Sequence, residues 1–353
     1  MSGATPRTRM AKKLKPQTIK ELETLLTDLL PLAQAAGDSD LITDLMTTVH
    51  RLLTEKTDRG DIKLISRALR ELRYAFKTFT PYRHLRKVTV FGSARTHGSD
   101  PSYKQAVAFA RAMVEQGYMV ITGAGEGIMR GAQEGAGRAQ SFGVNIELPF
   151  EQMPNAFIHE DPKLIACKYF FTRKLIFVKE SHALALFPGG WGTMDEGFEV
   201  LTLQQTGKSA PMPIVFIDEP GGTYWAEWRE YNVRHLLQRK LISPEDLHLF
   251  MITDRPDAAV NEILTFYKNY HSSRYVHGRL VFRLNHPVPD SLLDTINRDF
   301  ADLVSQGKIE QGAALPEERN DHELIHLPRL LFWFNRKNSG RLRQLIDTLN
   351  RAY

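Results

Sequence analysis

The stretch Phe187-Pro188-Gly189-Gly190-Trp191-Gly192-Thr193-Met194-Asp195-Glu196 decides how the rest of this sequence is interpreted. The apolar run 183–187 before it is typical of a buried strand, and apolar residues recur at helical spacing after it. A glycine-rich turn therefore joins a strand to a helix N-terminus, where backbone N–H groups and the helix dipole favour an anion such as phosphate. The lysine of a nucleoside-triphosphatase loop is absent, which excludes that class of phosphate loop.

When only the glycines are considered, a purely structural role for this turn is as well supported as ligand binding. Glycines are common in tight turns. Thr193 and Glu196 have the spacing of a capping box, in which Glu196 would only close the first turn of the helix.

Composition limits the class of protein. The 353 residues are 42% hydrophobic, enough for one large domain with appendages. No apolar run is long enough to cross a membrane, and the basic N-terminus lacks an apolar signal core, so we expect no membrane association. Cys167 is the only cysteine, which excludes an intrachain disulfide and a cysteine metal cluster and fits a cytoplasmic location.

The net charge of +5 is concentrated at the N-terminus. Residues 1–20 carry six lysines and arginines and no acid, so +5 minus +6 leaves −1 for the remainder. The body of the chain is therefore not a basic nucleic-acid-binding surface, and no nucleic-acid partner is expected.

Three regions follow from the patterning. Residues 1–80 combine the basic tail with a helical extension, in which leucines recur at helical spacing. Residues 81–275 alternate short apolar runs with helical stretches, the runs being 88–91, 118–122, 144–148, 183–187 and 214–217. This alternation predicts an α/β fold, a Rossmann-like, doubly wound parallel sheet.

Special residues follow four of these strands. The loops are Gly92-Ser93-Ala94-Arg95, Gly123-Ala124-Gly125-Glu126-Gly127, Pro149-Phe150-Glu151-Gln152 and Pro188–Thr193. The carboxyl ends of parallel strands share one edge of a sheet, so the loops predict a single site for a nucleotide-type ligand. The second loop is not a dinucleotide fingerprint, because Ile128 stands where the third glycine is needed.

The pattern of apolar residues in 276–353 predicts a small α+β appendage. The expected strands are 280–284 and 330–334, and the expected helices are 289–304 and 341–349. Phe332, Trp333 and Phe334 are consecutive, so their side chains point to both faces of the sheet. One face must then be covered by another part of the protein, which predicts that the appendage docks on the main domain or on a neighbouring subunit.

Four stretches together resemble one family. They are Phe91–Arg95, Thr122–Met129, Phe170-Phe171-Thr172-Arg173-Lys174 and Pro188–Glu196. Over roughly residues 86–275 the chain is similar to the Lonely Guy family of nucleoside 5′-monophosphate phosphoribohydrolases, formerly labelled lysine decarboxylase-like, in its longer type. Ala124 departs from the family pattern, in which glycine is common at this position.

The resemblance implies hydrolysis of the N-glycosidic bond of a nucleoside monophosphate, of AMP or cytokinin type, to free base and ribose 5-phosphate. It implies a catalytic pair, Arg173 and Glu196, and no metal or cofactor. It also implies a homodimer or an assembly of dimers, which fits the apolar stretch Phe170, Phe171, Leu175, Ile176 and Val178. The residues expected to contact substrate are Gly92, Ser93, Arg95, Gly123, Gly125, Gly127, Lys174, Gly189, Gly190, Gly192 and Thr193, with Glu126 and Gln152 as weaker candidates.

The chemistry of these residues is consistent with that reaction. A carboxylate beside the ribose can stabilise an oxocarbenium-like transition state and orient water. Arg173 could polarise the departing base or hold the phosphate, and both roles stay open. A Cys167–His182 dyad is rejected because neither residue lies at a glycine-rich elbow. The alternative function is nucleotide or molybdenum-cofactor binding without turnover on the same fold.

Overall fold

The computed structural model describes residues 19–148, 153–318 and 323–353. The chain divides into two compact units at the bond between Arg67 and Ala68, and each unit is described by itself. None of the helices in the described ranges combines the length and the apolarity that crossing a bilayer requires.

The first unit is helical, as the sequence predicts. It contains α1 (Ile19–Ala36), α2 (Ser39–Thr54) and the beginning of α3 (Arg59–Phe79). A turn at Gly37, where φ is +76°, joins α1 to α2. The second half of α3 belongs to the other unit, where Ala75 and Phe79 enter the core.

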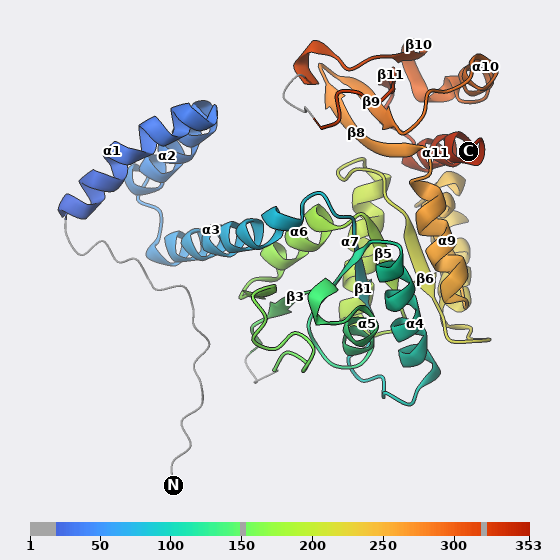
Figure 1. Cartoon of the computed structure of the whole chain (residues 1–353), viewed down its shortest axis with the longest axis horizontal. Helices are drawn as coiled ribbons and strands as arrows, with labels where there is room; N and C mark the ends of the chain where they lie inside the picture. Colours follow the sequence, from blue (N-terminus) through green and yellow to red (C-terminus); the bar gives the residue numbers. More distant parts are fainter. Residues whose placement is uncertain (1–18, 149–152, 319–322) are drawn as a thin grey trace. The chain divides into compact units, whose positions relative to one another are not determined.

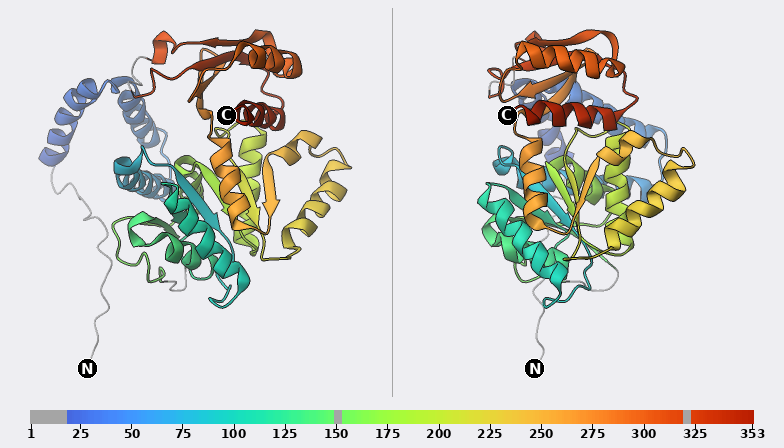
Figure 2. Two further views of the ribbon diagram at one scale, coloured as in Figure 1. Left: turned by 45° about the vertical axis from the view of Figure 1, so that its right-hand side comes forward. Right: turned by 90° about the vertical axis from the view of Figure 1, so that its right-hand side faces the viewer.

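The second unit contains a doubly wound sheet of seven parallel strands (Figures 1 and 2). Their order is β4-β3-β2-β1-β5-β6-β7. The bounds are β1 (Lys87–Phe91), β2 (Met119–Thr122), β3 (Ser141–Ile146), β4 (Leu164–Cys167), β5 (Ala183–Leu186), β6 (Ile214–Ile217) and β7 (Phe250–Thr253). The α/β fold predicted from the sequence is therefore confirmed.

Helices cover both faces of this sheet. One core contains side chains of α4 (Pro101–Glu115), α5 (Ile128–Ala136) and α9 (Pro256–Phe266). The other contains side chains of α3, α6 (Phe170–Glu180), α7 (Trp191–Gln205) and α8 (Tyr224–Asn232). The central strands are buried on both faces, which explains their continuous apolar sequences.

The sheet differs from the prediction at its edges. The two outermost strands, β4 and β7, are missing from the prediction, and β3 begins at Ser141 rather than at Val144. Ser141 and Gly143 weaken the strand pattern of β3, but their backbones pair with Val120 and Thr122 of β2. A Cβ on Gly143 would lie only 2.9 Å from Leu164 Cδ1 of β4, so the glycine leaves room for the Leu164 side chain.

A four-stranded antiparallel sheet of order β10-β11-β9-β8 follows. Its strands are β8 (Tyr270–Val276), β9 (Arg279–Leu284), β10 (Val304–Gly312) and β11 (Arg329–Phe334), with helices α10 (Asp290–Asp299) and α11 (Ser339–Arg351). The expected division between residues 275 and 276 falls inside β8. The sequence does not reveal β8 or β10, because polar, partly exposed residues dominate both strands.

The appendage packs on the sheet domain through α11, as the sequence predicts (Figures 1 and 2). The side chain of Asn350, which is fully buried, accepts hydrogen bonds of 2.9 Å from the N–H groups of Asn269 and Tyr270. The Ser339 hydroxyl donates to the Gln205 carbonyl at the end of α7 (3.0 Å). Buried polar bonds of this kind fix the orientation of α11.

Candidate active site

Three of the predicted loops are joined at Ser93, at the carboxyl edge of the sheet. The Ser93 N–H donates to the Pro188 carbonyl (3.1 Å), and the Ser93 carbonyl accepts from the Ile128 N–H (3.0 Å). Because β1 lies between β2 and β5, its loop can bond to both neighbours. The fourth predicted loop, with Gln152, lies outside the described residues.

Close packing between the loops explains three of the glycines. A Cβ on Gly92 would lie 2.6 Å from Ile128 Cγ2, and one on Gly189 would lie 2.2 Å from Thr193 Oγ1. Gly127 has φ +64°, and its Cβ would lie 2.2 Å from the Ser93 carbonyl oxygen. These three residues therefore shape the turns, as the structural alternative holds.

Gly190 and Gly192 have a different environment. A Cβ on either would meet no atom of the described residues within 4 Å, so packing does not require glycine there. Both residues are exposed at the start of α7, and Trp191 between them is 93% exposed. The open side of this helix N-terminus leaves room for an anion close to the backbone.

The capping-box interpretation of Thr193 and Glu196 is wrong. The helix begins at Trp191 with Gly190 as its N-cap, and no side chain caps it. The Gly190 carbonyl accepts from the N–H groups of Thr193 and Met194 (both 3.1 Å). Glu196 therefore lies in the second turn, and its carboxylate is available for another role.

Arg173 and Glu196 lie close together between α6 and α7. Arg173 Nη1 is 3.9 Å from Glu196 Oε1, and its Nε donates to the Val144 carbonyl (2.9 Å). A Cβ on Gly123 would lie 2.3 Å from Arg173 Nη2, so the absence of a side chain at Gly123 makes room for the guanidinium. The second loop thereby positions the arginine.

Burial raises the pKa of Glu196 to about 7, although Arg173 and Lys174 act to lower it. Only 4% of Glu196 is exposed. Burial likewise lowers the pKa of Arg173, and Glu196 opposes that shift. A carboxyl group that titrates near neutral pH can take part in proton transfer or stabilise positive charge, which is typical of catalytic carboxylates.

Lys174 contacts the acidic side chains of α7. Its Nζ is 2.8 Å from Asp195 Oδ1 and 2.9 Å from Glu199 Oε2. The lysine therefore links α6 to α7 next to the Arg173–Glu196 pair.

The remaining candidates differ in exposure. Arg95 is exposed, and its N–H bonds to the Ser93 hydroxyl (3.1 Å). Gly125 is buried. Glu126 is half-exposed and pairs with Arg130 one helical turn on (3.1 Å), an arrangement typical of a solvated helix surface.

Sequence reasoning missed Asn155. Its side chain is buried and donates to the Gly125 carbonyl (2.8 Å) and to Gln133 Oε1 (2.6 Å). Its backbone N–H donates to the carbonyl of Ala124, which has φ +62°. Asn155 thus holds the second loop in a backbone conformation that alanine rarely adopts. No motif surrounds Asn155 that could have revealed this.

Cys167 and His182 do not form a catalytic dyad. Cys167 is the last residue of β4, whereas His182 immediately precedes β5, and the strands β3, β2 and β1 lie between β4 and β5 in the sheet. Burial raises the pKa of the Cys167 thiol to about 12 and lowers that of His182 to about 4. The His182 Nδ1 accepts the Lys87 N–H (3.2 Å), a structural bond.

Several solved structures resemble parts of the chain. A molybdenum cofactor binding protein from Rippkaea orientalis is 18% identical, with 50% of this chain and 91% of that chain covered and a TM-score of 0.34. The Moco carrier protein of Chlamydomonas reinhardtii is 20% identical, with 51% and 98% covered and a TM-score of 0.35. DNA processing protein A of Helicobacter pylori is 15% identical, with 46% and 83% covered and a TM-score of 0.32.

Comparison with curated proteins gave no match. The comparison with protein families did give one. Residues 126–263, which include Arg173, Glu196 and the glycine-rich turn before α7, match the family described as "Possible lysine decarboxylase".

Proposed function

We propose that this protein hydrolyses the N-glycosidic bond of a nucleoside 5′-monophosphate to give the free base and ribose 5-phosphate. The observation that carries the proposal is the buried Arg173–Glu196 pair beside the open N-terminus of α7. The match of residues 126–263 to the possible lysine decarboxylase family supports it, because this segment contains two of the four stretches that carry the resemblance, Phe170–Lys174 and Pro188–Glu196.

The N-terminus of α7 would bind the 5′-phosphate. Its first turn carries the exposed Gly190 and Gly192, over which a phosphate can approach the backbone. The helix dipole stabilises the charge of the phosphate. Binding of the phosphate fixes where the ribose lies, and Glu196 is one helical turn beyond the first turn of α7.

Glu196 would act on the ribose. As the C1′–N bond breaks, its electron pair leaves with the base and positive charge develops on the sugar. The carboxylate stabilises that charge and orients a water molecule, whose oxygen bonds to C1′ and whose proton ends on the base. A pKa of about 7 keeps a large fraction of Glu196 ionised at neutral pH.

Arg173 would support this step in one of two ways. It can polarise the departing base or hold the phosphate, and both fit a buried guanidinium 3.9 Å from Glu196. In either role its positive charge lowers the pKa of Glu196 and so favours the carboxylate.

The direct test is release of free base from a panel of purine and pyrimidine nucleoside monophosphates, followed by chromatography. We expect base and ribose 5-phosphate in equal amounts from at least one substrate. The Glu196→Gln variant should bind that substrate without turning it over, and Glu227→Gln, at an exposed position of α8, is the matched control. Tight nucleotide or molybdenum-cofactor binding with no base released by the wild type would instead support the non-catalytic alternative.

We also propose that the protein forms a homodimer, or an assembly of dimers, through α6 and α7. Phe170, Phe171 and Leu175 of α6 are about half exposed, as is Phe198 of α7. Ile176 is buried and Val178 packs against the core, so they serve the fold itself. An apolar surface of this kind usually has a partner. Light scattering at micromolar concentration should give at least twice the chain mass, and a monomer would contradict the proposal.

A further inference from the structure

A loop outside the four predicted ones also contacts the glycine-rich turn before α7. The hydroxyl of Tyr224, the first residue of α8, donates to the carbonyl of Gly189 (2.5 Å). Because β5 lies between β1 and β6, the loops after both neighbouring strands end at the same edge of the sheet as the turn. The turn is therefore held from two sides, by Ser93 after β1 and by Tyr224 after β6.

Buried contacts fix the position of Tyr224. Asp218, the residue after β6, is buried, and its Oδ2 accepts a hydrogen bond from the Trp225 N–H (3.1 Å). The Trp225 ring is fully buried and meets the Tyr224 ring edge-on, with the two ring centroids 4.7 Å apart. The start of α8 is thus tied to the sheet, so the Tyr224 hydroxyl is held at a defined place.

The hydrogen bond from Tyr224 sets the orientation of the Gly189–Gly190 peptide. This peptide is trans, so its carbonyl and its N–H point in opposite directions. With the carbonyl directed at Tyr224, the Gly190 N–H points to the other side of the peptide. None of the described residues accepts a hydrogen bond from the N–H groups of Gly190, Trp191 and Gly192. Three consecutive donors at the start of α7 are therefore available to a ligand.

The two glycines would allow this peptide to turn over. Rotation of its plane by about 180° would exchange the positions of the carbonyl and the N–H, and it would change φ of Gly190 from −89° to roughly +90°. Glycine adopts positive φ readily, whereas other residues rarely do. A carbonyl oxygen in place of the N–H would repel a phosphate. The Tyr224 hydroxyl opposes this rotation, because it stabilises only the orientation in which the Gly189 carbonyl faces it.

We propose that Tyr224 is a positioning residue for phosphate recognition, whose hydroxyl holds the Gly189–Gly190 peptide with its N–H toward the 5′-phosphate. This role rests on the proposed function, in which the start of α7 binds that phosphate. Tyr224 acts through the backbone of the turn and not on the ribose or the base. It therefore contributes to substrate binding rather than to bond cleavage, because the contact with the phosphate is made equally in the ground state and in the transition state.

Titration calorimetry of the full chain with ribose 5-phosphate measures this contribution without turnover. Tyr224→Phe removes one oxygen and keeps the ring beside Trp225. We expect its Kd for ribose 5-phosphate to rise by at least about fivefold, since hydrogen bonds to a charged acceptor are strong. For the preferred nucleoside monophosphate, KM should rise by a similar factor while kcat stays within about twofold. Tyr231→Phe, at an exposed position of the same helix, should leave the Kd unchanged.

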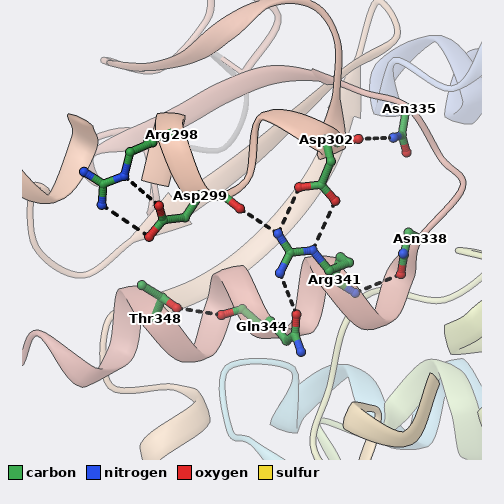
Figure 3. A network of polar contacts seen from close by, with 8 residues as sticks. All are labelled: Arg298, Asp299, Asp302, Asn335, Asn338, Arg341, Gln344 and Thr348. Carbon is green, nitrogen blue, oxygen red and sulfur yellow. Dashed lines mark hydrogen bonds and ion pairs between the residues drawn. The ribbon is translucent and has the colours of Figure 1, made fainter. Parts of the chain in front are cut away.

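Two further variants distinguish positioning from a loss of stability. Asp302→Ala removes the carboxylate that accepts two hydrogen bonds from Arg341 in the appendage (2.9 and 3.1 Å; Figure 3), and it should lower the melting temperature without changing the Kd. Gly190→Ala adds a Cβ that meets no described atom within 4 Å, and it disfavours positive φ. The effect of Tyr224→Phe on the Kd should therefore be at least about twofold smaller when Gly190→Ala is also present. Equal effects in the two backgrounds would overturn the proposal.

Binding and base release are measured separately, so their outcomes can be told apart. An unchanged Kd in Tyr224→Phe, with base released by the wild type, would overturn the role of Tyr224 and leave the proposed reaction in place. A raised Kd, with no base released by the wild type, would support the role of Tyr224 and refute the reaction. If ribose 5-phosphate does not bind to the wild type, both the phosphate site and the role of Tyr224 are refuted.

Discussion

Two buried arginine–glutamate groups in this molecule contain the same residue types and behave in opposite ways. In the appendage, Glu318 is fully buried and bonds Arg329 Nε (3.0 Å) and Arg283 Nη2 (2.7 Å). In the sheet domain, Glu196 lies 3.9 Å from Arg173. Burial acts to raise the pKa of both carboxyls, but the hydrogen bonds from Arg329 and Arg283 outweigh it for Glu318, whose pKa is lowered. For Glu196 the effect of burial is larger than the opposing effect of Arg173 and Lys174, so its pKa is raised to about 7.

The difference separates a fully paired carboxylate from an incompletely paired one. Glu318 has its acceptor capacity satisfied, with the Leu315 N–H as a further donor, so its charge is stable and unavailable. The 3.9 Å gap leaves Glu196 without a close hydrogen bond from Arg173, so its charge costs free energy until a ligand supplies positive charge. Burial of a charge does not by itself indicate structure or function; the completeness of its pairing does.

The largest effect is expected from Glu196→Gln. Turnover of the preferred nucleoside monophosphate should fall by about two to four orders of magnitude, because the carboxylate charge is lost. The folded pKa of about 7 lies above the ordinary 4.5, so this carboxyl destabilises the fold progressively as pH rises from 4.5 to about 7, and the loss stays constant above that range. Calorimetry at pH 8 should therefore show an equal or higher melting temperature, and a large decrease would identify Glu196 as structural.

Glu318→Gln should have the opposite consequence. It leaves two buried arginines without a carboxylate and should lower the free energy of unfolding by about 3 kcal/mol. Turnover per folded molecule should stay within about twofold of the wild type. Glu310→Gln, which breaks the exposed pair with Arg279, is the control, with an expected loss of about 0–1 kcal/mol by urea denaturation. Equal losses of unfolding free energy in Glu318→Gln and Glu310→Gln would contradict the structural role of the buried Glu318 group.

Gly123→Ala tests whether the position of Arg173 matters. The new Cβ would lie 2.3 Å from Arg173 Nη2, so the guanidinium must move. We expect roughly a 10- to 100-fold loss of turnover, since small misplacements of an active-site group are costly. Gly98→Ala, where a Cβ meets no described atom within 4 Å, should retain full activity. If Gly123→Ala were fully active, the position of the Arg173 guanidinium would not matter for turnover.

The smallest effect concerns pH. If the carboxylate is the active form, kcat/KM should fall tenfold per unit as pH decreases below about 7. Lys174 acts to lower the pKa of Glu196, so Lys174→Met should move the midpoint of this profile to higher pH. Lys179→Met on the same helix should leave the midpoint unchanged. A downward shift for Lys174→Met would show that its charge does not favour the carboxylate.

Local signals in the sequence were sufficient for much of the molecule. Continuous apolar runs identified five of the seven parallel strands, because central strands are buried on both faces. Parallel topology then placed the loops after β1, β2 and β5 at one edge, where hydrogen bonds through Ser93 join them. The sequence could not distinguish Gly189, which packing requires, from Gly190, around which space is open.

The sequence by itself determined the α/β fold, the edge that carries the glycine loops and the residue types of the candidate pair, since these depend on periodicity and turn chemistry along the chain. Only the tertiary structure decided which buried carboxylate is fully paired, that Asn155 holds the second loop, and that Tyr224 bonds the glycine-rich turn. Distances between groups far apart in sequence set each of these features. The distances to arginine differ by about 1 Å between the hydrogen-bonded Glu318 and the incompletely paired Glu196, and no local pattern encodes that difference.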